Sequence, residues 1–318
     1  MMDNKYFVFW KRIFAFWTDS LILAILANFI LIFGFDFIAK IGNFGALIGF
    51  VIFMAYYGVQ NSEICKGQTI GKRLFRIKVV DGNNNYLSLQ KSFLRALMLT
   101  PVFVFNSLMF PIGTGAVVYQ AIVGFYSALV IFLFLFNWPQ RRSLHDFTVK
   151  SIVVANDCEN TEITHSKKPH IIIGTVSVLF LMLCAGIFTA APKIGLDFNQ
   201  INSISKVFSE QNMKLVGYSI QRNYTFAPKD AQTIQADAPV SSINLVVADS
   251  KIDINNKNFA NARVNDAARI FFKSKVSETN VDFVNISLIK RASIGANSKI
   301  QRFSKNGTQQ QWREEIFR

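Results

Sequence analysis

The chain has 318 residues, of which 51% are apolar and only 17% are charged, and its 34 Lys and Arg against 20 Asp and Glu give a net charge of +14. This balance excludes an intrinsically disordered chain and argues against one soluble domain, in which about a quarter of the residues are charged. Three Cys without a CxxC pair exclude a disulfide scaffold and a zinc finger. A basic excess indicates either nucleic acid or an anionic membrane surface. The apolar runs decide for the membrane, so no nucleic acid is expected as a partner.

Several apolar runs approach the roughly 20 residues that a helix needs to cross about 30 Å of hydrocarbon. The four clearest runs are, in chain order, 13–35, 44–59, 116–138 and 171–191. A fifth run, 94–111, contains an Arg and a Pro, and it either spans the membrane or is re-entrant. The first run holds an Asp and exceeds a signal-peptide core in length, so it is expected to be a retained helix. The predicted fold is an α-helical polytopic membrane bundle of four to five transmembrane helices.

Loop charges predict the orientation, because Lys and Arg collect on the cytoplasmic side. Residues 1–12, 60–95 and 139–170 hold 15 Lys and Arg, whereas 36–43 and 112–115 hold one. The N-terminus is therefore expected in the cytoplasm, with five crossings of a bacterial cytoplasmic (inner) membrane if 94–111 spans. The predicted organisation is a transmembrane domain at 1–155, a cytoplasmic linker at 156–170, an additional transmembrane helix at 171–191 and an extracytoplasmic α+β domain at 192–318.

Two regions outside the apolar runs have the pattern of β-structure. Residues 76–81 and 86–89 flank a Gly-Asn-Asn-Asn turn, which predicts a β-hairpin, and 148–154 is a β-branched run on the same side. We expect these segments to form a small cytoplasmic sheet. In the C-terminal region, strands are predicted at 214–222, 242–247 and 281–289, with 299–303 pairing with the last. A helix capped by Asn258 is predicted at 258–274.

Gly67, Gly71 and Lys72 resemble part of a phosphate-binding P-loop. That motif needs four residues between the glycines and a Ser or Thr after the Lys, whereas this chain has three residues and Arg73. The ATPase interpretation is therefore rejected. The basic side chains of this segment are instead expected to contact anionic lipid headgroups at the membrane surface. They are Lys72, Arg73, Arg76 and Lys78.

Charged residues within or next to the apolar runs are candidates for function. Arg12 and Asp19 are seven residues apart, nearly two helical turns, and so share one face of the first helix. A charge at the centre of a spanning helix costs about 2.5–3.5 kcal/mol, so Asp19 either exchanges a proton or cation or is paired structurally. Asp146 follows the 116–138 run on the side of Arg12, beside His145, whose unperturbed imidazole titrates near neutral pH. Asp146 either pairs with Arg12 or a neighbouring Arg, Arg141 or Arg142, or lies on a transport path.

These charges occur in motifs that resemble the RDD family of bacterial membrane proteins over residues 6–155. The motifs are KRIFAFWTD at 11–19, GQTIGKRLFRIKVVD at 67–81, SFLRAL around Arg95, and RRSLHDFTVKSIVV at 141–154. By this resemblance, the Arg and two Asp that give the family its name are Arg12, Asp19 and Asp146. The resemblance implies a role in transport, with some members linked to sodium–proton exchange. The additional helix and the C-terminal domain lie outside it.

Two functions follow from these observations. The first is a transporter of small ions or solutes, in which Asp19 exchanges a cation for a proton, Arg12 tunes it, and Asp146 and His145 lie at the cytoplasmic mouth; a homo-oligomer would supply the wall that five helices lack. The alternative is a non-catalytic membrane scaffold or sensor whose outer C-terminal domain binds a ligand or protein partner. An enzyme is not expected, because residues 192–318 contain no His and no Cys and hold no catalytic set. No metal and no cofactor are expected either.

Overall fold

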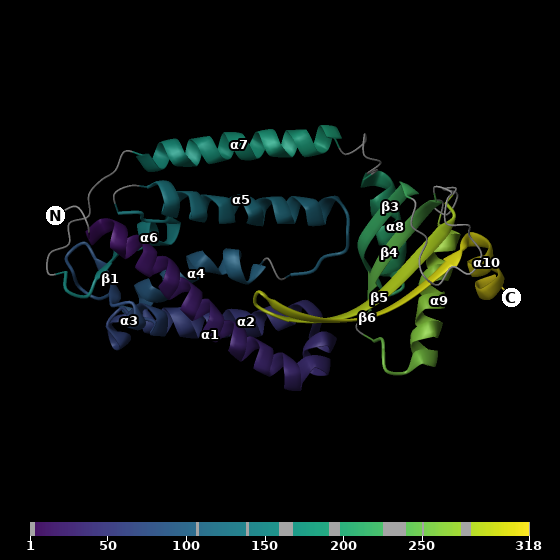
Figure 1. Cartoon of the computed structure of the whole chain (residues 1–318), viewed down its shortest axis with the longest axis horizontal. Coiled ribbons are helices and arrows are strands. Elements are labelled where there is room, and N and C mark those ends of the chain that lie inside the picture. The colour runs from purple at the N-terminus through teal and green to yellow at the C-terminus, as the bar shows by residue number, and fades with distance from the viewer. Residues whose placement is uncertain are drawn as a thin grey trace.

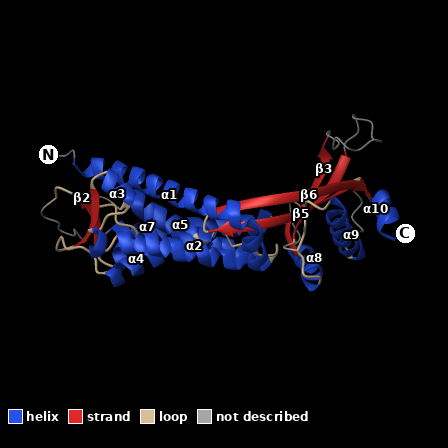
Figure 2. Ribbon diagram, turned by 90° about the horizontal axis from the view of Figure 1, so that it is seen from below, coloured by secondary structure: helices blue, strands red, loops and turns tan. Residues whose placement is uncertain are grey.

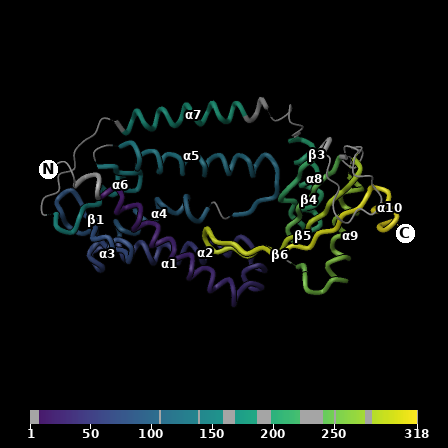
Figure 3. Tube along the Cα trace, viewed as in Figure 1, coloured from purple at the N-terminus to yellow at the C-terminus, as the bar shows by residue number. Residues whose placement is uncertain are grey.

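The computed structural model describes residues 4–105, 108–137, 140–158, 168–190, 198–224, 240–249, 251–274 and 281–317. A layer of long helices occupies one end of the molecule, and a four-stranded sheet with three helices occupies the other (Figures 1 and 2). The chain begins at the far end of the helical layer and ends in the sheet region (Figure 3). The predicted combination of a helical membrane part and a C-terminal α+β part is therefore confirmed in its coarse form.

The helical layer is built from long apolar helices joined by short helical segments. The long helices are α1 (Asn4–Ile41), α2 (Gly45–Met54), α4 (Leu89–Phe103), α5 (Thr114–Phe136) and α7 (Lys168–Ala190). The short segments are the 3₁₀ turns Gly42–Phe44 and Glu63–Cys65, a π-helical turn at Ala55–Val59, α3 (Ile70–Leu74) and α6 (Leu144–Thr148).

Three helical segments are long and apolar enough to cross a membrane: Val8–Val59, Thr114–Phe136 and Pro169–Gly186. The first of them contains both α1 and α2, which follow each other with only the 3₁₀ turn Gly42–Phe44 between them. The chain reverses at Gly42, whose φ of +57° favours glycine, and α2 runs back along α1 (Figure 1). The run at 94–111 forms α4, which is 15 residues long and has Pro101 inside it. Whether four or five helices span, and which side is cytoplasmic, stay predictions.

Helix α1 is long enough to reach from one surface of a membrane to the other. Arg12 and Asp36 are separated on this helix by about 36 Å, at 1.5 Å per residue. The hydrocarbon layer is about 30 Å thick, so both charges fit at its borders, and Asp19 is the one charged residue between them. Asp19 lies two turns from Arg12 on the way to Asp36, and its position within the membrane stays a prediction.

The small sheet pairs different segments from those predicted. Strand β1 (Ile77–Asp81) pairs antiparallel with β2 (Ser151–Ala155), in the register Ile77↔Ala155 to Asp81↔Ser151. The predicted hairpin between 76–81 and 86–89 is wrong, although the β-branched run at 148–154 does join the sheet. On its other edge, the backbone N–H of Val79 donates to Gly67 O at 2.9 Å, so that position is not available to residues 86–89. The Asn-rich turn is closed by Asp81: its backbone N–H donates to Asn85 O at 2.9 Å, and its side chain accepts from the backbone of Asn83 and Asn85 at 2.9 and 2.8 Å.

The C-terminal region is a four-stranded sheet in the order β3-β4-β5-β6, in which only β4 and β5 are parallel. The strands are β3 (Lys214–Tyr224), β4 (Val240–Ala248), β5 (Phe283–Ile294) and β6 (Asn297–Thr308). Helices α8 (Phe198–Glu210), α9 (Lys257–Lys273) and α10 (Gln309–Phe317) contribute to the same buried core as the strands. The predicted strands and α9 are present, but α9 is capped by Asn256 rather than Asn258.

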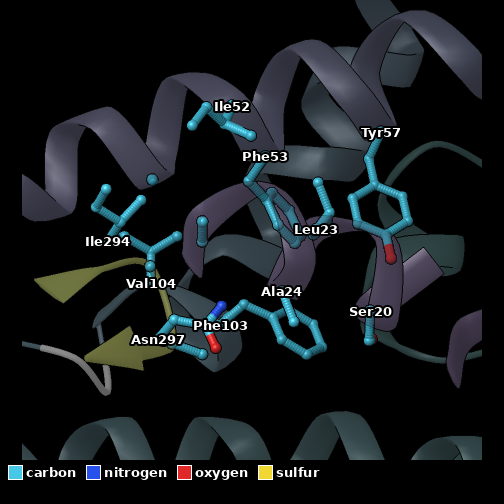
Figure 4. Close-up of a pocket in the computed structure, with 14 residues that line it drawn as sticks. Ser20, Leu23, Ala24, Ile52, Phe53, Tyr57, Phe103, Val104, Ile294 and Asn297 are labelled. Atoms are coloured by element: carbon cyan, nitrogen blue, oxygen red, sulfur yellow. The ribbon is translucent and has the colours of Figure 1, made fainter. Parts of the chain in front are cut away.

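The last hairpin extends beyond its own domain and enters the helical layer. Strands β5 and β6 stay paired out to Ile294↔Asn297, and the buried Ala292 and Ile294 pack against the α1 residues Leu31 and Phe35. A cavity of about 100 Å³ lies between the hairpin tip and the helices, and its lining includes Ile294 and Asn297 of the hairpin and Phe103 and Val104 at the end of α4 (Figure 4). The hairpin tip is therefore part of the core of the helical layer.

Candidate functional site

Asp146 is the centre of a buried charge cluster at the β1–β2 end of the helices. Its Oδ2 accepts from Arg12 Nη2 at 3.0 Å, and its Oδ1 accepts from Arg95 Nε and Nη2 at 3.1 and 2.8 Å. Ser151 Oγ also donates to Oδ1, and the backbone N–H of Ser143 donates to Oδ2 in the capping box that begins α6. One fully buried carboxylate thus joins α1, α4, α6 and β2.

The electrostatics of this cluster keep Asp146 ionised. Burial alone would raise the pKa of Asp146, but the two guanidinium groups of Arg95 and Arg12 hold that pKa well below its ordinary value. Burial also lowers the pKa of His145 to about 3, so the imidazole next to Asp146 is neutral at physiological pH. Its Nε2 lies 3.5 Å from Asp146 Oδ1. A neutral His145 does not act as the proton switch near neutral pH that an isolated imidazole would provide.

Asp19 is also buried, and its partners are neutral groups. Tyr56 Oη and the backbone N–H of Gly71 donate to Oδ1, both at 2.7 Å, and Thr69 Oγ1 donates to Oδ2 at 2.6 Å. Thr69 is the N-cap of α3, so Asp19 holds the start of this short helix against α1. Gly71 is required there because a Cβ at this position would lie 2.2 Å from Ala15 O.

Arg12 and Asp19 lie on one face of α1, but they do not form an ion pair with each other. Arg12 turns to Asp146, and its Nη1 donates to Arg141 O at 3.1 Å. Of the predicted partners of Asp146, Arg12 forms the pair, whereas Arg142 donates to the backbone oxygens of Ser151 and Asp146. The structure thus brings Arg12, Asp146 and His145 into contact and places Asp19 in a separate hydrogen-bond network.

Both networks border one cavity of about 440 Å³ between α1, α4 and α5. Its polar lining includes Arg12, Asp19, Lys72, Arg95 and His145. Its apolar lining comes from the three helices and includes several aromatic side chains: Ile13, Phe16, Trp17, Leu99, Val102, Phe103, Val130, Ile131, Phe134 and Leu135. The cavity therefore combines apolar walls with buried charges of both signs.

The four basic residues predicted at the membrane surface do not share one environment. Arg73 and Arg76 are exposed, and Lys78 is partly exposed on β1. Lys72 instead points into the cavity, where its Nζ donates to Asn61 Oδ1. Contact with anionic headgroups at the membrane surface stays a prediction for the other three side chains, while Lys72 belongs to the interior site.

Sequence reasoning did not assign a site role to Arg95, Tyr56 or Thr69. Arg95 had a signal, since it is a charge within the apolar run 94–111. Thr69 lies in the glycine motif, which was considered only as a phosphate site. Tyr56 lies in the π-helical turn Ala55–Val59, and π-helical turns occur frequently at functional sites, but they have no reliable sequence signature.

The described residues define a helical membrane protein with a buried Arg and Asp cluster and a separate C-terminal α+β domain. Residues 6–150 match the model of the RDD family. The resemblance seen in the motifs is thereby confirmed, and this part of the chain is an RDD region. No curated protein and no solved structure matches the chain. The match ends before α7 and the sheet of the C-terminal domain, so the family says nothing of that part.

Proposed function

We propose that this protein transports a small ion or solute across the membrane through the cavity between α1, α4 and α5. The single observation that carries the proposal is that charged side chains line an apolar-walled cavity between α4 and two helices, α1 and α5, that are apolar enough to span. Ionisable groups at membrane depth are costly and mark ion or substrate pathways in membrane proteins. The family resemblance points in the same direction.

The finer form of the proposal is cation/proton exchange at Asp19. This carboxylate lines the cavity, and its three hydrogen-bond donors are neutral, so among the described residues its charge is not neutralised by an ion pair within 4.0 Å. A bound monovalent cation or a proton would supply that neutralisation. Arg12 and Arg95 are already engaged by Asp146, which makes them positioning groups for the wall of the cavity.

The test is cation-driven proton movement in inside-out vesicles, followed with a pH-sensitive dye as Na⁺, Li⁺ or K⁺ is added. Asp19→Asn keeps the size of the side chain and removes its charge, and it is expected to abolish the exchange. Thr69→Val removes a hydrogen bond to Asp19 but keeps the carboxylate, so it separates charge from packing. The exposed Asp157→Asn is the matched control for the chemical change. Exchange in wild type that persists in Asp19→Asn would refute the role of Asp19, and wild type behaving as empty vesicles would refute cation/proton exchange.

The alternative function, a scaffold or sensor, is favoured by a different observation. The outer domain is joined to the helices by its own β5–β6 hairpin, whose tip is buried between α1 and α2. A ligand or partner that binds the outer domain and moves this hairpin would change the packing of the helices. Deletion of residues 198–318 distinguishes the functions. It would remove sensing, whereas transport would persist, at a rate altered by loss of the hairpin tip from the helical core, because every charged residue that lines the cavity lies in the RDD region.

A further inference from the structure

Lys72 is a partly buried basic side chain that forms no ion pair among the described residues. Its Nζ donates to the neutral Asn61, and no carboxylate oxygen of the described residues lies within 4.0 Å of it. Desolvation lowers the pKa of Lys72 well below its ordinary value and the positive charge of Arg95 lowers it further, while the charges of Asp19 and Asp146, beyond ion-pair distance, partly oppose this. Buried charges are normally paired. The side chain faces the cavity, so an anion bound there would complete its environment.

His145 provides a second, independent observation at the same cavity. The residue is 7% exposed, and its Nδ1 has no hydrogen-bond partner among the described residues. Nε2 lies on the side of the Asp146 carboxylate, which favours the proton on Nε2 and leaves Nδ1 as an acceptor. Buried acceptors are nearly always satisfied, so this atom indicates a ligand that brings an O–H or N–H donor.

The cavity has exposed apolar lining residues on two helices that are apolar enough to span a membrane. Among its lining residues, Trp17 on α1 and Ile131 on α5 are 69% and 49% exposed. Both helices are among those apolar enough to span, so these side chains lie where acyl chains would contact them. An apolar mouth with a cationic interior suits a molecule that has an acidic head and an apolar chain.

The geometry points to an acidic phospholipid with a hydroxylated headgroup as the molecule bound here, with its phosphate at Lys72, its headgroup hydroxyl at His145 Nδ1 and its acyl chain between Trp17 and Ile131. The charges at the site agree, because the lining cations Arg12, Arg95 and Lys72 outnumber Asp19 of the lining together with Asp146, which lies behind the lining and pairs with Arg12 and Arg95. This inference goes beyond the proposed transport function and does not depend on it, since lipid binding is measured without any flux.

The experiment measures lipid binding by native mass spectrometry on the full chain in detergent. Phosphatidylglycerol and phosphatidylcholine with the same acyl chains are titrated separately. Wild type is expected to prefer phosphatidylglycerol. Lys72→Gln is expected to lower the affinity for phosphatidylglycerol about tenfold, the loss of one charge-assisted hydrogen bond. Lys72→Arg is expected to restore part of it, and the neighbouring, exposed Arg73→Gln is expected to bind as wild type.

Two further measurements test whether the ligand is a lipid and whether the site can be tested without changing Lys72. Glycerol phosphate, which has the same head without a chain, distinguishes a lipid from a free anion, and it is expected not to displace the lipid. Ile131→Trp narrows the mouth without touching a charge, so it tests the site if Lys72→Gln fails to fold, and it is expected to weaken lipid binding. The inference would be overturned if wild type bound both lipids equally. It would also be overturned if Lys72→Gln and Ile131→Trp both bound phosphatidylglycerol as wild type does, or if glycerol phosphate displaced the lipid.

Discussion

A methyl group on α2 is expected to release the β5–β6 hairpin from the helices. A Cβ at Gly49 would lie 2.1 Å from Gly295 N and 2.6 Å from Gly295 Cα, and one at Gly45 would lie 2.5 Å from Ser293 O. These atoms belong to the backbone of the hairpin and cannot rotate away. Small residues four apart usually allow two helices to approach each other, and here they admit the tip of a hairpin.

The size of the effect follows from what the tip buries. Ile294 is 2% exposed and Ala292 is fully buried against α1. Lifting the tip would expose Ile294, and full burial of such a side chain is worth about 1.5–3 kcal/mol. Gly49→Ala is therefore expected to raise the population of the undocked hairpin about tenfold to a hundredfold.

Hydrogen exchange of the full chain in micelles measures this population. In Gly49→Ala, the amides of residues 290–300 are expected to exchange faster by the same factor, while those of β3 and β4 remain as in wild type. Gly124→Ala is the matched control, because a Cβ at this helical glycine of α5 would meet no atom within 4 Å. Equal exchange of the hairpin in the two variants would refute the docking argument.

Three other variants test the buried network. Asp146→Asn leaves the guanidinium groups of Arg12 and Arg95 without their carboxylate and is expected to cost about 3–5 kcal/mol of unfolding free energy; denaturant unfolding beside Asp157→Asn measures it, and a cost equal to that of the control would contradict the pairing. His145 has a folded pKa of about 3 against an ordinary value of 6.5, so the unfolded chain binds the extra proton and stability falls as the pH drops below 6.5. Between pH 7 and pH 5 the loss is expected to be about 2 kcal/mol, and His145→Gln should remove this part of the pH dependence of unfolding. Gly71→Ala forces α3 away from Ala15 O and is expected to cost about 1–3 kcal/mol in the same assay, whereas Gly124→Ala should cost nothing.

The sequence was sufficient to predict features that depend on local pattern. Runs of apolar residues gave the long helices, because a spanning helix satisfies its backbone internally and needs only length and composition. Alternation gave the positions of β3 to β6, and the RDD motifs identified Arg12, Asp19 and Asp146. Each of these features depends only on residues that are close together in the chain.

Features that depend on long-range contact were missed or wrong. The hairpin at 76–89 looked complete locally, but β1 pairs with β2 more than 70 residues later. Arg12 and Asp19 share a helix face, yet Arg12 pairs with an Asp that is 134 positions away. The length of the β5–β6 hairpin was underestimated because its tip alternates only weakly and is ordered by α1 and α2. Partners so distant in the chain leave no periodic signal in either segment.

The two candidate functions share one helix, and this gives a further test. Near one end, α1 carries Arg12 and Asp19 at the cavity, and near the other end Asp36 accepts from Lys290 Nζ of the hairpin at 2.7 Å. If the hairpin sets the packing of the helices that wall the cavity, Gly49→Ala is expected to change the rate of cation-driven proton movement, although residue 49 does not line that cavity. Unchanged transport together with faster hydrogen exchange of the hairpin would mean that the C-terminal domain is anchored to the helices without controlling them.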